Sequence, residues 1–97
     1  MNKERVQLLV DALRSGEFTQ VLGKYRGGSM CFCGLGVMIE VYRQQFLPDK
    51  PFDCYQEFAA CRSFGFNSTH LEAIQKANDK DRRTFPEIAD MIEGWIT

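Results

Sequence analysis

The stretch from Gly23 to Glu40 constrains the fold of this chain more than any other part of it. After Gly23 it holds four more glycines, at positions 27, 28, 34 and 36, together with Cys31 and Cys33. Glycine loses more backbone freedom on folding than any other residue, so glycines that a stable fold keeps usually mark positive φ angles or close backbone approach. This stretch is therefore the best candidate for a binding site.

The size and charge of the chain limit its fold and its partners. Its 97 residues, 44% hydrophobic and 12% aromatic, suffice for one domain over residues 1–97 with a single core. The 12 basic and 13 acidic residues are interspersed, and the formal net charge of -1 argues against duplex nucleic acid as a partner. The short basic run from Lys80 to Arg83 includes Asp81 and follows Asp79, as in a solvated loop.

The chain carries no signal for a membrane. No apolar run reaches the roughly 18 to 20 residues that a membrane-spanning helix needs. The first residues lead into an amphipathic helix and lack the apolar core of a signal peptide. We therefore expect a cytoplasmic protein with no membrane partner, in which the four cysteines, at positions 31, 33, 54 and 61, stay reduced.

Apolar residues at helical spacing predict about five helices. The first three are expected over residues 3–14, 35–46 and 53–64, and Pro48 stops the second. Two capping boxes, Thr69–Glu72 and Thr84–Glu87, predict a fourth helix over residues 69–76 and a fifth from residue 84 onward.

Two β-prone segments, residues 18–25 and 29–33, lie on either side of Gly27 and Gly28. They predict a short antiparallel hairpin. A two-stranded ribbon is marginally stable alone, so we expect it to pack on the helices. The predicted fold class is α+β, a single small domain of about five helices and one hairpin.

The spacing of the cysteines argues against a structural zinc site. Structural zinc sites favour two to four residues between paired ligands, whereas one residue separates Cys31 from Cys33 and six separate Cys54 from Cys61. Packing in the core is the favoured interpretation, with the latter two on the apolar face of the third helix. His70 is the only histidine and is expected at the surface, so no nucleophile and base are paired. We expect no metal, no cofactor and no catalysis.

Gly34 and Gly36 open the second predicted helix. Helix starts expose unpaired N–H groups and a positive partial charge, which suit a phosphate group. A dinucleotide fingerprint would need a third glycine, and Ile39 stands in that place. Close packing of the helix against the hairpin is the other explanation of these glycines.

The hairpin residues complete a candidate site for a nucleotide-type ligand. Lys24 and Arg26 flank the turn and suit phosphate, and Tyr25 suits stacking on a base. An ordinary solvated edge strand explains the same cations, because edge strands carry lysine against aggregation. Asn78 and Asp79 are expected to stabilise a turn. The predicted ligand-binding residues are Gln20, Lys24, Tyr25, Arg26, Ser29, Gly34 and Gly36.

Several short motifs follow one another over nearly the whole chain. They are Asp-Ala-Leu-Arg-Ser-Gly-Glu-Phe (11–18), Gln20, Gly23, Tyr25-Arg26, Phe-Cys-Gly-Leu-Gly-Val (32–37), Asn78-Asp79, Phe-Pro-Glu-Ile-Ala-Asp (85–90) and Ile92-Glu93. This order resembles a family of small bacteriophage and prophage proteins that read Ala-Leu-Arg-Ser-Gly, Phe-Cys-Cys-Leu-Gly-Val-Leu-Cys and Ser-Phe-x-Glu-Ile-Ala-Asp. The resemblance implies a viral setting more than an activity. Gly34 and Ile39 replace two cysteines of that pattern, which argues against a shared metal role.

Two functions are consistent with these features. The first is a small phage protein that binds and sequesters a nucleotide-derived ligand, such as a host immune signal, and so counters defence in the infected bacterial cell. The second is a protein-interaction module that docks onto a host or viral protein through an aromatic surface. Small proteins commonly form homo-oligomers. The sequence is therefore consistent with a pocket within one chain and with a pocket between two chains. The aromatic surface comprises Phe52, Phe58, Phe64 and Phe66.

Overall fold

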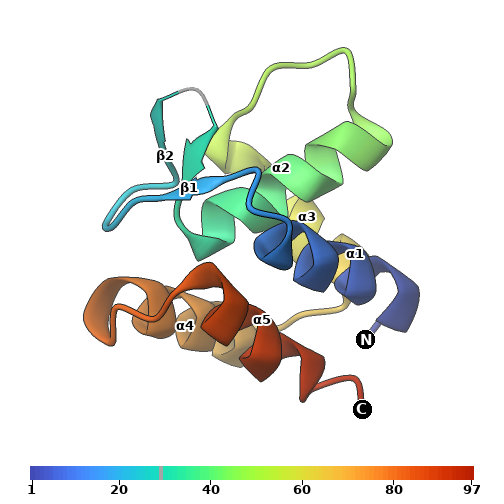
Figure 1. The fold of residues 1–97 in the computed structure, drawn as a ribbon. Helices are drawn as coiled ribbons and strands as arrows, with labels where there is room; N and C mark the ends of the chain where they lie inside the picture. The colour runs from blue at the N-terminus through green and yellow to red at the C-terminus, as the bar shows by residue number, and fades with distance from the viewer. Residues whose placement is uncertain (29) are drawn as a thin grey trace.

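Five α-helices accompany a small three-stranded sheet in the computed structural model, which describes residues 1–28 and 30–97 (Figure 1). The protein is a single α+β domain, as the sequence predicts. Helix α1 (Lys3–Arg14) begins at Asn2, whose side chain accepts a hydrogen bond from the backbone N–H of Arg5 (3.1 Å). Its apolar residues Val6, Leu9, Val10 and Leu13 are all buried.

Helix α5 (Phe85–Glu93) packs along α1, although the two lie at opposite ends of the chain (Figure 1). It begins with the predicted capping box, in which Glu87 accepts a hydrogen bond from the backbone N–H of Thr84 (2.9 Å). Arg14 of α1 binds Asp90 (2.7 Å) and Glu93 (2.9 Å), and these bonds raise the pKa of Arg14. The two ends of the chain are therefore joined by both packing and charge.

Helix α2 (Gly34–Phe46) lies at the centre of the fold, and its residues 34–41 are buried. It begins at Cys33, whose sulfur accepts a hydrogen bond from the backbone N–H of Gly36 (3.4 Å). The third predicted helix forms as η1 (Cys54–Gln56) followed by α3 (Glu57–Phe64), and ends at Gly65 with a φ of 76°.

Helix α4 (Ser68–Gln75) starts one residue earlier than predicted, and the predicted Thr69–Glu72 capping box is wrong. Asn67 is the cap instead, because its side chain accepts from His70 N–H (3.1 Å) while the His70 ring accepts from Asn67 N–H (3.0 Å). The helix then continues as a π-helical turn, η2 (Lys76–Lys80). This turn carries residue 78 into the interior.

The sheet differs from the predicted hairpin. Strand β2 (Arg26–Gly28) pairs antiparallel with β3 (Cys31–Phe32), and β1 (Thr19–Gln20) adds to β3 in parallel, in the order β1-β3-β2. The segment 18–25 is therefore not the antiparallel partner. Residues 21–25 lie outside the strands, and Val21 and Gly23 bind Asn78 and Asp79 of η2. Gly27 and Gly28 belong to β2 and not to the turn.

The exposure of several side chains differs from the sequence prediction. Phe64 and Phe66 lie in the core, and Phe52 packs on Phe32, so Phe58 alone of the predicted aromatic surface is strongly exposed, at 79%. Cys54, which is expected to pack in the core, is exposed and lies in η1, where no residue is buried. Among the described residues, no helix is long and apolar enough to cross a membrane.

Candidate functional site

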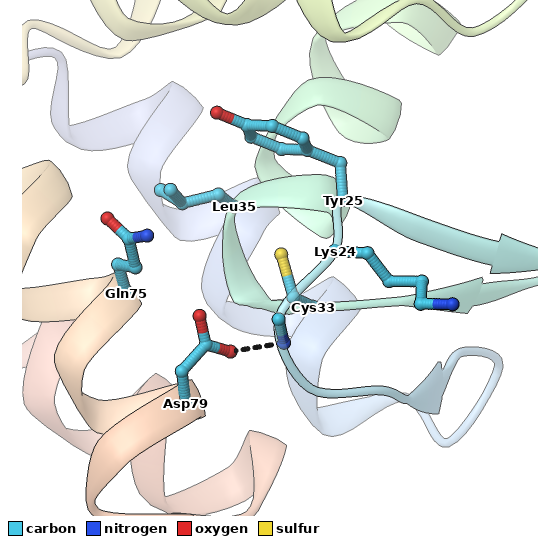
Figure 2. A pocket seen from close by; sticks show the side chains of 7 residues that line it. Lys24, Tyr25, Cys33, Leu35, Gln75 and Asp79 are labelled. Carbon is cyan, nitrogen blue, oxygen red and sulfur yellow. Dashed lines mark hydrogen bonds between the residues drawn. The ribbon is translucent and has the colours of Figure 1, made fainter.

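A hollow of about 90 Å³ lies between the loop of residues 23–25, the start of α2 and the end of α4 (Figure 2). The loop is held there because the backbone N–H of Gly23 donates a hydrogen bond to Asp79 Oδ1 (2.9 Å). This is the region in which the sequence predicts a ligand. The residues that line the hollow are Gly23, Lys24, Tyr25, Cys33, Leu35, Gln75 and Asp79.

The volume of the hollow limits what it can enclose. Pockets that bury a whole drug-sized ligand measure roughly 300 to 1,000 Å³. A hollow of about 90 Å³ therefore admits one edge of a nucleotide and leaves the rest outside.

Asn78 holds the walls of the hollow together and is only 1% exposed. Its Oδ1 accepts hydrogen bonds from Gln20 Nε2 (2.8 Å) and from the backbone N–H of Gly34 (3.1 Å). Its Nδ2 donates to the carbonyl of Val21 (3.0 Å) and to Asp79 Oδ1 (2.7 Å). The predicted turn role of Asn78 and Asp79 is wrong, because both side chains bind segments far away in the sequence.

The hollow presents hydrogen-bonding groups of different kinds. Asp79 Oδ1 is already engaged, and Figure 2 shows its second carboxylate oxygen facing the space between Gln75 and Cys33. An exposed carboxylate oxygen beside an amide suits ligand groups that carry N–H donors, such as the edge of a base. The inner part of the hollow therefore favours a donor group over a phosphate.

Tyr25 and Cys33 are both held in their neutral forms. The Tyr25 hydroxyl donates a hydrogen bond to Glu57 Oε2 (2.7 Å), and this bond raises the pKa of Tyr25 to about 12. Burial raises the pKa of the Cys33 thiol, so the sulfur is a weak nucleophile. Cys33 packs in the core as the sequence predicts.

The predicted site residues are only partly brought together. Lys24 and Tyr25 line the hollow, but Figure 2 shows the Lys24 side chain running away from its interior. The Arg26 guanidinium lies over the rings of Phe32 (5.5 Å) and Phe52 (5.6 Å). Gln20 binds Asn78 and the carbonyl of residue 83, and Ser29 lies outside the described residues.

Gly34 and Gly36 are placed for close packing at the start of α2. A Cβ at Gly34 would lie 2.9 Å from the Ile74 side chain, and a Cβ at Gly36 would overlap the carbonyl oxygen of Tyr25. Their N–H groups donate to Asn78 and Cys33. Packing therefore accounts for both glycines without an anion.

The segment that follows Asp79 in the chain carries further cations. Residues 80–83 are exposed, as the sequence predicts, and include Lys80, Arg82 and Arg83. Gln20 Nε2 donates to the carbonyl of Arg83 (2.6 Å), and Gly23 is bound to Asp79. The first contact joins β1 to residue 83, and the second joins the loop that contains Lys24 to Asp79.

Sequence reasoning missed Gln75, Asn78 and Asp79 as parts of the site. Asn78 and Asp79 stand out as a pair in the sequence, but local rules assign such a pair to a turn. No local signal marks Gln75, because only the folding of α4 against the loop 23–25 brings it to the hollow.

The comparisons with known proteins give one match. A family model described as "Domain of unknown function (DUF8296)" matches residues 1–63. No curated protein and no solved structure matches the chain.

Proposed function

The chain belongs to this family of domains of unknown function, DUF8296, and we propose that it captures a nucleotide-derived ligand at the hollow between loop 23–25 and α2. The ligand's base edge enters the hollow, where the Asp79 carboxylate and the Gln75 amide meet its N–H groups. Its phosphates stay outside, near Lys24 and the loop 80–83. The observation that carries the proposal is the hollow itself, which combines acceptors inside with cations on two adjoining loops.

The proposal assigns binding and not turnover. The Cys33 thiol is buried with a raised pKa, and the His70 ring is engaged as a helix cap. Stoichiometric capture needs no catalytic group. We place it in a phage-infected bacterial cell, where removal of a host immune signal would counter defence, and this setting rests on the motif resemblance.

Thermal unfolding with a panel of mononucleotides, cyclic dinucleotides and ADP-ribose tests the proposal. A ligand that binds only the folded protein raises its melting temperature in proportion to the logarithm of its concentration. Lys24→Glu should remove most of that rise by repelling phosphate. Gln75→Ala should reduce it, because the exposed amide no longer meets the base edge.

The matched control is Lys50→Glu, which makes the same charge change in the exposed loop after the far end of α2. It should keep the full shift. The proposal is wrong if no member of the panel stabilises the protein and heating releases no ultraviolet-absorbing compound. It is also wrong if Lys24→Glu and Lys50→Glu lower the shift equally.

A further inference from the structure

The Asp79 carboxylate divides its two oxygens between the fold and the hollow. Oδ1 accepts hydrogen bonds from the backbone N–H of Gly23 (2.9 Å) and from Asn78 Nδ2 (2.7 Å). Oδ2 makes no hydrogen bond to any described residue, and Figure 2 shows it facing the hollow. The bonds at Oδ1 fix the carboxylate, so a ligand meets one negatively charged acceptor at a defined position.

Gln75 lies one helical turn before Asp79, and both side chains line the hollow. The Gln75 amide makes no hydrogen bond within the described part of the chain, and Figure 2 shows its nitrogen on the side toward Cys33. An amide nitrogen donates hydrogen bonds, whereas a carboxylate oxygen accepts them. The polar wall of the hollow therefore offers a donor and an acceptor that are one turn apart.

The Tyr25 ring and the Leu35 side chain supply an apolar wall. Tyr25 is held at two points, because its hydroxyl donates to Glu57 Oε2 (2.7 Å) and its carbonyl accepts from the backbone N–H of Cys33 (3.3 Å). An aromatic ring held in this way suits stacking on a base. The hollow thus has an apolar surface for the face of a base and polar groups for its edge.

The common bases differ in the donors and acceptors along their pairing edge. Guanine has two adjacent donors, N1–H and N2–H, next to the acceptor O6. Adenine and cytosine place a ring-nitrogen acceptor beside one amino group, and uracil has a single N–H between two carbonyls. A carboxylate oxygen binds N–H donors strongly and is repelled by an acceptor that faces it. Guanine is therefore the base that brings two donors to a carboxylate and an acceptor to a neighbouring amide.

We propose that the hollow selects guanine, and that Asp79 and Gln75 determine this choice. Guanine N1–H and N2–H donate to Asp79 Oδ2, and the Gln75 amide nitrogen donates to O6. The purine stacks on Tyr25, and the sugar and phosphates stay outside the hollow. This inference rests on the proposed function, since it names the base of the nucleotide that is captured at the same site.

Three nucleotides that differ only in the base test the inference on the wild-type protein. Guanosine monophosphate should bind at least about tenfold more tightly than adenosine monophosphate in titration calorimetry, because adenine turns an acceptor toward the carboxylate. Inosine monophosphate keeps N1–H and O6 but lacks the N2 amino group, so it should bind about fivefold more weakly than guanosine monophosphate. The phosphate is the same in all three, so the differences report on the base alone.

Asp79→Asn tests the carboxylate itself. The amide oxygen can keep the bonds from Gly23 and Asn78, while an NH₂ donor takes the place of Oδ2. Guanosine monophosphate should then lose its advantage over adenosine monophosphate. Xanthosine monophosphate, in which a carbonyl replaces the N2 amino group, should bind the variant more tightly than it binds the wild type.

The matched control is Asp49→Asn, which removes the same charge in the exposed turn after α2. It should keep the preference for guanine, and circular dichroism should show the same helix content in both variants. Equal binding of adenosine and guanosine monophosphates to the wild type would overturn the selection of guanine while leaving nucleotide capture intact. A preference for guanine that survives in folded Asp79→Asn would overturn it too. Failure of every nucleotide to bind would instead contradict the proposed function, and this inference with it.

Discussion

A single buried amide, that of Asn78, joins three parts of the chain. It accepts from Gln20 and Gly34 and donates to Val21, and these partners lie 58, 44 and 57 residues away. A buried polar group that loses its partner costs about 1–3 kcal/mol. The hollow therefore depends on one side chain that does not line it.

Asn78→Ala should lower the free energy of unfolding by about 2–5 kcal/mol, because it leaves the Gly34 N–H and the Val21 carbonyl unpaired. Denaturant unfolding followed by circular dichroism measures this. The matched control is Asn67→Ala, which removes a helix cap and should cost about 1 kcal/mol. Equal losses for the two variants would mean that Asn78 acts only locally.

Position 36 requires glycine, because the start of α2 leaves no room there for a Cβ. Gly36→Ala places a Cβ on the carbonyl oxygen of Tyr25, which is backbone and cannot move away cheaply. We expect a loss of about 3 kcal/mol or more, the upper range for strained core substitutions. Gly28→Ala is the control, since a Cβ there meets nothing within 4 Å and should change stability little. Similar melting temperatures for both variants would contradict the close approach.

At the scale of the elements, the start of α5 is fixed by charge as well as by hydrogen bonding. Bonds from Thr84 hold the pKa of Glu87 below its usual 4.5. Its folded pKa is thus lower than its unfolded pKa. The stabilisation by this carboxylate is fully present above pH 4.5 and is lost as the pH falls through the folded value.

Glu87→Gln keeps an acceptor but removes the charge. The melting temperature of the wild type should exceed that of the variant near neutral pH, and the difference should shrink as the pH falls below 4.5. Scanning calorimetry across the acid range measures it. Glu72→Gln, in an α4 whose cap is Asn67 instead, is the control. A difference that does not change with pH would show that the carboxylate charge plays no part.

Local sequence signals predict the elements well but not how they join. Periodicity and capping place α1, α2 and α5 correctly, because those signals lie within each helix. The parallel pairing of β1 with β3 differs from the predicted hairpin, and the contacts that hold the following residues, such as Gly23 to Asp79, join segments far apart in the sequence. Lys24 and Tyr25, which line the hollow, lie in a loop that its glycines mark in the sequence. Gln75 also lines the hollow, but it lies on an ordinary helix and has no local sequence signal.

On the scale of the whole molecule, the C-terminal third completes the core. The family model ends at residue 63, inside α3. Residues beyond it supply α4, η2 and α5, which cover α1 and cap the start of α2. The matched region therefore depends for part of its packing on the residues that follow it.

A chain of residues 1–63 should not fold cooperatively, because the apolar face of α1 loses α5 and the Gly34 N–H loses Asn78. Its thermal melt should be broad and its amide proton spectrum poorly dispersed, whereas the full chain should give a single sharp transition. A cooperative melt of residues 1–63 would show that the C-terminal helices are an addition to a complete domain.

The span of the Asn78 hydrogen bonds also sets an order of events during synthesis. Asn78 is made 44 residues after Gly34, which at ribosomal rates takes roughly 2 to 9 s. For that time the Gly34 N–H at the start of α2 lacks its Asn78 partner, and Val21 is not bound to Asn78. The hollow between loop 23–25 and α2 can therefore take its final shape only after Asn78 has been synthesised.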